Sequence, residues 1–250
     1  MPTHRKLAIT VGVLYLATFV TSIPALALKQ SFLSGEGSPA TLHWAVILEI
    51  ALALACIGTA VAFSPVGKRH DPALALGFVA SRTLEAATVF LGVIALLAVG
   101  TLRATAALGE AGAADAALVA VHDWAFLMGP GLLPAVNALL FGTLLFRARL
   151  VPRIIPLVGL IGAPLLALSA VGTLVGVLDQ VSAIAGLAAL PIALWELSIG
   201  IWLIVKGFSP SAIAAGEAPS TGAPPHAPPW PPSPLEKPGA RGRTPAPRWP

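Results

Sequence analysis

Six long runs of apolar residues alternate with short polar connections along this chain. The hydrocarbon core of a bilayer is about 30 Å thick, so a helix that crosses it needs about 20 apolar residues. The third and fourth runs are longer than that, and must tilt, bend or project from the membrane. The pattern predicts an all-α fold, a polytopic bundle of six transmembrane helices, over residues 7–28, 42–63, 73–102, 116–146, 154–178 and 183–205.

Composition indicates the same class of protein. Of the 250 residues, 56% are hydrophobic and 10% are charged, whereas about a quarter of the residues of a soluble protein are charged. We therefore expect an integral membrane protein whose main partner is the lipid bilayer. The net charge of +4 gives no ground for a nucleic-acid partner. The single cysteine, Cys56, excludes a disulfide or a cysteine-based metal site within one chain.

The distribution of lysine and arginine predicts the orientation in the membrane. Cytoplasmic connections of membrane proteins carry an excess of these residues. If the spans alternate in direction, Lys29 and Arg103 fall on one side. The other side carries Arg5, Lys6, Lys68, Arg69, Arg147, Arg149, Arg153 and Lys206. We therefore expect both termini in the cytoplasm and the spans in the cell (inner) membrane.

The two ends of the chain are interpreted separately. His4-Arg5-Lys6 and the apolar run after it resemble a signal peptide, with Ala25-Leu26-Ala27 as a cleavage site. The run exceeds the roughly 7–15 residues of a signal core, so we expect an uncleaved first span. Residues 209–250 are rich in proline, alanine, glycine and serine. Because such a segment cannot bury a core, we expect a disordered cytoplasmic tail after a membrane domain of residues 1–208.

Six acidic, arginine or histidine side chains lie away from the ends of the predicted spans: Glu49, Arg82, Glu85, His122, Asp123 and Glu196. A charged side chain at the centre of a span costs about 2.5–3.5 kcal/mol on insertion scales, so it needs a partner or water. Arg82 and Glu85 are three residues apart and share one face of a helix. The glutamates lie on stripes of small residues, which favour the interior of a membrane bundle. The topology places all six between the outer surface and the midplane, so we expect one outward-facing cavity.

The predicted cluster has more acids than cations. Four carboxylic acids accompany one permanent cation, Arg82, and one titratable cation, His122. Like charges in a low dielectric do not all stay ionised. Either some acids hold protons, or a cation is bound, or water enters the cavity.

The fourth span contains a predicted helix break at Gly129, Pro130 and Gly131. Pro130 has no N–H to donate to the carbonyl of Phe126, which would leave that oxygen free to accept a hydrogen bond or to bind a cation. Broken helices at mid-membrane depth are common at the binding sites of transporters.

Three functions are consistent with this cluster. The leading hypothesis is a membrane protein that binds or translocates a small solute, a proton or a cation. The first alternative is a structural or accessory protein whose buried ion network only fixes helix packing. The second is an intramembrane enzyme with a metal bound by His122, Asp123 and a glutamate. One His beside one Asp is a weak metal signal, and motifs for nucleotide hydrolysis or zinc proteolysis are missing. We therefore predict neither a metal site nor a cofactor, lean against an enzyme, and leave the oligomeric state open.

Several short stretches resemble one family of bacterial integral membrane proteins, catalogued as domain of unknown function 4386. They are Gly12-Val13-Leu14-Tyr15-Leu16, Ala120-Val121-His122-Asp123-Trp124, Gly129-Pro130-Gly131, Trp195-Glu196-Leu197-Ser198 and Leu203-Ile204-Val205-Lys206-Gly207-Phe208. The resemblance covers roughly Arg5–Pro210 and implies a membrane topology and a bacterial origin, but no activity. The family resembles this chain in having polar residues at Arg82, Glu85, His122, Asp123 and Glu196. The proline-rich tail departs from the family pattern.

Overall fold

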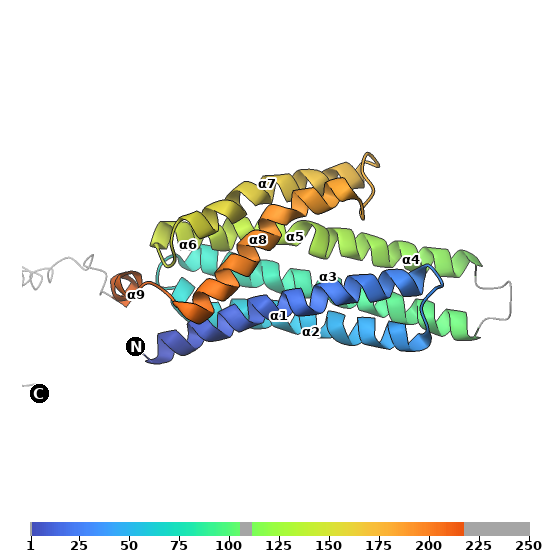
Figure 1. Cartoon of the computed structure of the whole chain (residues 1–250), viewed down its shortest axis with the longest axis horizontal. Coiled ribbons are helices and arrows are strands. Elements are labelled where there is room, and N and C mark those ends of the chain that lie inside the picture. Colours follow the sequence, from blue (N-terminus) through green and yellow to red (C-terminus); the bar gives the residue numbers. More distant parts are fainter. Residues whose placement is uncertain (1, 106–111, 218–250) are drawn as a thin grey trace, which may run out of the picture. The chain divides into compact units, whose positions relative to one another are not determined.

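The computed structural model describes residues 2–105 and 112–217, and these residues form helices without strands (Figure 1). The first three long helices are α1 (Pro2–Leu33), α2 (Pro39–Gly67) and α3 (Pro72–Thr105). A fourth helical stretch comprises α4 (Gly112–Phe126), η1 (Leu127–Leu132), α5 (Leu133–Asn137), η2 (Ala138–Gly142) and α6 (Thr143–Ala148). The last elements are α7 (Ile154–Leu174), α8 (Ala183–Val205) and the short α9 (Pro210–Glu217).

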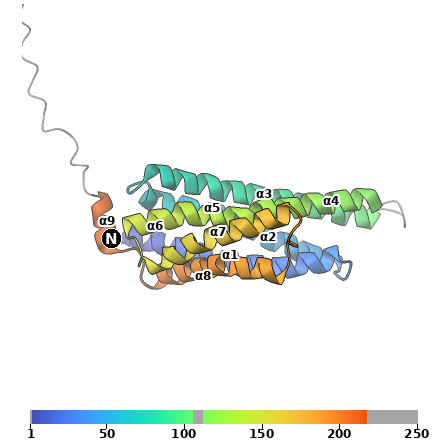
Figure 2. The ribbon, with the colours of Figure 1, turned by 90° about the horizontal axis from the view of Figure 1, so that it is seen from above.

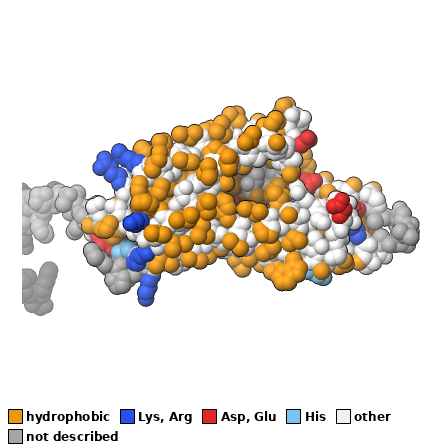
Figure 3. All heavy atoms as spheres, viewed as in Figure 1, with side chains coloured by type: hydrophobic (Ala, Val, Ile, Leu, Met, Phe, Trp, Pro, Cys, Tyr) orange, Lys and Arg blue, Asp and Glu red, His pale blue; other side chains and the backbone are white. Residues whose placement is uncertain are grey.

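Six of these helical stretches are long and apolar enough to cross a membrane, and each corresponds to one predicted run. They are Thr3–Leu33, Pro39–Gly67, Pro72–Thr105, Gly112–Ala148, Ile154–Leu174 and Ala183–Val205. Large apolar side chains such as Val20, Leu76 and Leu187 are exposed on their outer faces, and apolar atoms cover most of the visible side (Figure 3). A surface of this kind is suited to lipid. The prediction of an all-α bundle with six spans is confirmed.

The six spans pack in the order of the sequence and close into a ring. Each span contacts the next along the chain, and α8 returns to contact α1 (Figure 2). The N-terminus and α9 lie at the same end of the bundle. We call this the basic end, because it also carries Lys68, Arg149 and Arg153, and we call the opposite end, with the α1–α2 and α7–α8 connections, the far end.

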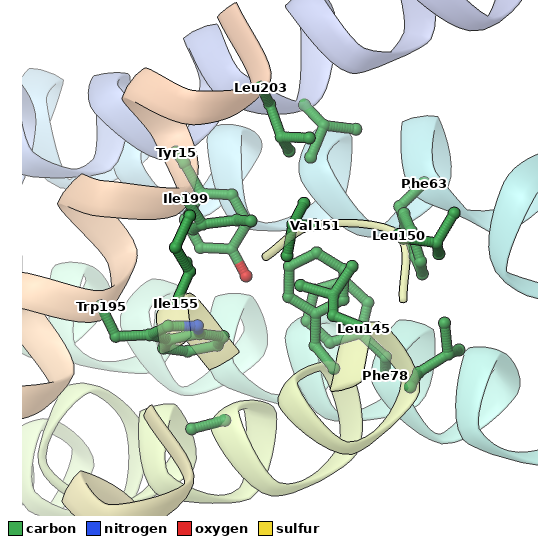
Figure 4. Close-up of a cluster of buried hydrophobic side chains, with 14 of the residues drawn as sticks. Tyr15, Phe63, Phe78, Leu145, Leu150, Val151, Ile155, Trp195, Ile199 and Leu203 are labelled. Carbon is green, nitrogen blue, oxygen red and sulfur yellow. The ribbon is translucent and has the colours of Figure 1, made fainter. Parts of the chain in front are cut away.

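Aromatic side chains fill the interior of the ring toward the basic end (Figure 4). Phe141 stacks on Phe78 with ring centroids 4.5 Å apart, and Phe63 meets Phe141 edge-on at 4.6 Å. Tyr15 and Trp195 extend this cluster toward α1 and α8. Because these rings come from five of the six spans, they hold the bundle together at a depth where apolar burial alone gives little gain over lipid.

Helices α1 and α8 make a close backbone contact near the basic end. A Cβ atom added at Gly12 would lie 2.6 Å from the backbone oxygen of Gly200. Such glycine contacts let two membrane helices approach closely. Toward the far end the two helices diverge (Figure 1), and a Cβ at Gly186 of α8 would meet open space.

The fourth span differs from its prediction. Its helix is not broken at Gly129, Pro130 and Gly131; it continues through η1 as a π-helical turn. In a π turn each carbonyl pairs with the N–H five residues on, so the N–H of Gly131 can serve Phe126 in place of the one that Pro130 lacks. The widened turn therefore avoids both the break and the free carbonyl.

Two further expectations need correction. Lys29, which we assigned to an outer connection, lies inside α1 and is buried. The tail expected from residue 209 begins instead with α9, because Ala212 is buried against the basic end and the Ser209 N–H donates to the Leu150 carbonyl. The rest of the predicted tail, residues 218–250, lies outside the described residues.

The contact between α1 and α8 makes a direct prediction. Gly12→Ala should lower the free energy of unfolding by about 1–3 kcal/mol, because the added methyl group forces two backbones apart. Gly186→Ala in α8 is the matched control and should be neutral or gain about 0.5–1 kcal/mol of helix propensity. Thermal unfolding in detergent micelles compares the two. Equal stability of both variants would show that this contact is not tight.

Candidate functional site

The ring encloses a cavity of about 330 Å³ on the far-end side of the aromatic cluster. Residues from all six spans line it, and Figure 3 shows a hollow between α8 and α1. Five of the lining side chains are acidic or basic: Lys29, Glu49, Arg82, Glu85 and Glu196. Most of the others are apolar, among them Phe19, Ile23, Leu26, Leu52, Phe126 and Ile192.

Arg82 and Glu85 form the floor of this cavity. The Nη1 of Arg82 donates to the Oε2 of Glu85 at 2.8 Å and to the sulfur of Cys56 at 3.5 Å. The Nδ2 of Asn137 donates to the same Glu85 oxygen at 2.7 Å. The guanidinium also lies over the ring of Tyr15, 4.9 Å from its centroid. Arg82 is 1% exposed, so these contacts replace its hydration.

Glu196 faces the floor from α8 without completing the network. Its Oε1 lies 3.9 Å from the Nη2 of Arg82, and within the described chain it makes no hydrogen bond. Two donors of Arg82, Nε and Nη2, are buried and have no partner among the described residues. The floor therefore presents unused donors and an unused acceptor side by side.

A second ion pair stands on the wall, nearer the far end. The Nζ of Lys29 lies 2.8 Å from the Oε1 of Glu49 and 3.9 Å from the centroid of the Phe126 ring. Both charged side chains are buried. Glu49 precedes Cys56 by seven residues, so this pair lies about 10 Å from the Arg82 contact along α2.

The structure brings four of the six predicted site residues into the cavity: Glu49, Arg82, Glu85 and Glu196. His122 and Asp123 do not line it, although the ring of His122 stacks on Phe126, which does. The Nδ1 of His122 lies 3.1 Å from the Oδ1 of Asp123, whose side chain is 54% exposed. The backbone carbonyl of Asp123 accepts from Gln180 in the α7–α8 connection, which places this pair at the far-end rim. The cavity therefore holds three acids and two cations.

A family model, described as Domain of unknown function (DUF4386), matches residues 10–207. The chain belongs to this family. The match to DUF4386 covers the first span from residue 10, the other five spans in full and every acidic or basic residue of the cavity, but not α9. No curated protein and no solved structure matches the sequence. The function of this DUF4386 chain is therefore argued from its geometry.

The geometry bears on the metal-dependent alternative as well. Within residues 2–105 and 112–217, no three His, Cys, Asp or Glu side chains come together as metal ligands would. His122 and Asp123 are two such groups without a third beside them.

Of the residues at which we predicted a helix break, Pro130 lines the cavity, while Gly129 is buried against Thr88 of α3.

Sequence reasoning missed Lys29 and the role of Asn137. Lys29 looked like an anchor after an apolar run, yet Thr18, Ser22 and Lys29 fall on one helix face, and Phe32 and Leu33 extend the run beyond it. That stripe was the available signal. Asn137 lies on the fourth span, and its side-chain amide donates to Glu85.

The wall pair gives the second prediction. Lys29→Met should lower the free energy of unfolding by about 3–5 kcal/mol, because it leaves the Glu49 carboxylate buried without a cation. Replacing both partners, Lys29→Met with Glu49→Leu, should recover most of the loss. Denaturant titrations in micelles measure both. If Lys29→Met alone is as stable as the wild-type chain, water must hydrate the Glu49 carboxylate, and this prediction is wrong.

The floor gives the third prediction. Glu85→Gln alone leaves Arg82 able to turn to Glu196, whereas Glu85→Gln with Glu196→Gln removes both carboxylates. The double variant should lose more stability than the sum of the single variants, with a coupling of about 1–3 kcal/mol. A double-mutant cycle on unfolding free energies gives this value. Additive losses would show that Arg82 and Glu196 do not interact.

Proposed function

We propose that this chain binds a small solute in the intramembrane cavity, as a transporter or as a membrane receptor for that solute. The observation that carries the proposal is the unmatched carboxylate: Glu196 faces a cavity whose other acids each have a hydrogen-bonded cation. Glu49 is paired with Lys29 and Glu85 with Arg82. The solute can be an uncharged molecule, a cation or a proton acceptor, provided that it interacts with Glu196.

A network that only fixes helix packing would differ in two respects. Every polar member of such a network would have a partner, whereas here two donors of Arg82 and the Glu196 carboxylate make no hydrogen bond within the described residues. Such a network would also leave little space beside it. Here the space measures about 330 Å³, within the range of roughly 300–1,000 Å³ typical of ligand pockets. Most of its lining is apolar with a few convergent polar groups, which is the usual composition of such pockets.

The one-sided position of the cavity supports a transport role within this proposal. The aromatic cluster closes the bundle toward the basic end, and the cavity lies on the other side. We propose that the basic end faces the cytoplasm of the cell membrane, by the positive-inside rule. The burial of Lys29 increases the difference in basic residues between the two sides, because Arg103 then remains the one lysine or arginine expected on the outer side. The cavity would then face outward, as in one state of an alternating-access cycle.

The fourth prediction tests solute binding. The probes are 1-hexanol, hexylamine and hexanoate, added to the chain in lipid nanodiscs. At least one should raise the unfolding temperature, by an amount corresponding to about 1.4 kcal/mol at ten times its dissociation constant. Ala193→Trp, which fills the cavity, should abolish the shift. Leu194→Trp places the same bulk on the exposed neighbouring position and is the matched control.

Two results would overturn this proposal. One is that none of the three probes stabilises the wild-type chain. The other is that the Ala193→Trp chain responds as strongly as the control. Should Ala193→Trp fail to fold, Glu196→Leu replaces it, because that variant keeps the Arg82–Glu85 pair and removes the carboxylate that the solute would contact.

A further inference from the structure

The cavity opens sideways between two membrane helices. Helices α1 and α8 touch at Gly12 and Gly200, and they separate toward the far end (Figure 1). At the opening the cavity is lined by Ile23 of α1 and by Ala189 and Ala193 of α8. Ile23 is 64% exposed, and the small side chains of Ala189 and Ala193 leave the gap unfilled.

The surface around this opening is apolar. On α1 the exposed neighbour of the opening is Val20, and on α8 the exposed neighbours are Leu190 and Leu194. Figure 3 shows hydrophobic atoms on both sides of the hollow. Ile23 and Ala193 also lie well inside their spans, Thr3–Leu33 and Ala183–Val205. The opening therefore faces hydrocarbon, and a molecule dissolved in the bilayer can reach the cavity without crossing water.

The floor requires a particular polar group. Arg82 offers two buried donors without a partner, and Glu196 offers an acceptor without a hydrogen bond among the described residues. Their facing atoms lie 3.9 Å apart. A single oxygen that accepts from the arginine and donates to the carboxylate satisfies both, which removes the cost of leaving buried polar groups unpaired. A hydroxyl group does this, whereas an ammonium has no acceptor and a carboxylate has no donor.

We propose that the solute is a membrane-soluble amphiphile with a hydroxyl head, which enters from the bilayer between α1 and α8. Its hydroxyl lies between Arg82 and Glu196, and its apolar chain lies along Phe19, Ile23 and Leu26 toward the lipid. This inference rests on the proposed function and adds the ligand class and the route. It explains why the charged floor lies at the base of a cavity whose lining is mostly apolar.

The experiment uses photo-crosslinking in nanodiscs of a single synthetic phosphatidylcholine. The probe is a sixteen-carbon primary alcohol with a diazirine in its chain, and labelled residues are mapped by mass spectrometry. Labels should fall on Phe19, Ile23 or Leu26 of α1 and on Ala189 or Ala193 of α8. Ile23→Trp, which narrows the opening, and Ala193→Trp, which fills the cavity behind it, should each reduce the labelling about tenfold. Leu194→Trp, outside the opening, should not reduce it.

The head group is tested with probes that have the same sixteen-carbon chain and diazirine but carry a methyl ether, an amine or a carboxylate in place of the hydroxyl. The alcohol should label the wild-type cavity about tenfold more than the ether, because the ether cannot donate to Glu196. In Glu196→Leu this preference should fall to nearly one. Stronger labelling by the amine or the carboxylate would overturn the assignment of the head, and undiminished labelling of Ile23→Trp would overturn the route.

The two proposals fail in different ways. If the hexyl probes stabilise the chain but no long-chain probe labels the cavity, solute binding stands and access from the bilayer is wrong. If neither occurs, both are wrong.

Discussion

A buried guanidinium sets the constraint on which the rest of this bundle depends. Arg82 is 1% exposed in the middle of a membrane-spanning helix, so its charge must be met by protein. Tyr15 of α1, Cys56 of α2 and Glu196 of α8 approach it, and Asn137 of the fourth span holds its partner Glu85. One arginine on α3 therefore connects five spans. In lipid, where apolar contacts give helices little reason to prefer one another, such polar contacts define which helices meet.

The cavity follows from how the ring closes around that network. Close packing at Gly12 and Gly200 and the stacked rings of Phe78 and Phe141 hold the basic end tightly. Toward the far end α1 and α8 separate, and the π turn at Pro130 widens the helix that faces them. Glu85 accepts hydrogen bonds from Arg82 and Asn137, whereas Glu196 lines the cavity without a hydrogen bond among the described residues. A carboxylate left free beside open space supports a site rather than a packing device.

Much of this arrangement was predictable from residue types and spacing. Six apolar runs of spanning length led to six helices, and the three-residue separation of Arg82 and Glu85 led to an ion pair on one face. Glu49 and Glu196 were expected to face inward because small residues flank them, and both line the cavity. These features depend on local periodicity, which a sequence displays directly.

The errors share a different cause. His122 and Asp123 were placed in the cavity by depth alone, but the fourth span starts beyond the α7–α8 connection and leaves Asp123 exposed at the rim. Lys29 was assigned to a connection because it follows the apolar run of residues 7–28, and the residue that pairs with it, Glu49, lies on another helix. Pro130 indicated a break, and a π turn absorbed it. Each outcome depends on how helices of unequal length pack together, and no single run of residues contains that information.

The position of α1 and α8 in a bilayer, apart from each other over a cavity with Arg82 and Glu196 at its floor, can be observed by electron cryomicroscopy of the chain in lipid nanodiscs. We expect an opening between Ile23 and Ala193, elongated density that reaches from the lipid to the Arg82–Glu196 gap, and Lys29 paired with Glu49. Helices α1 and α8 packed together along their whole length, with a direct hydrogen bond closing the gap between Arg82 and Glu196, would contradict this expectation.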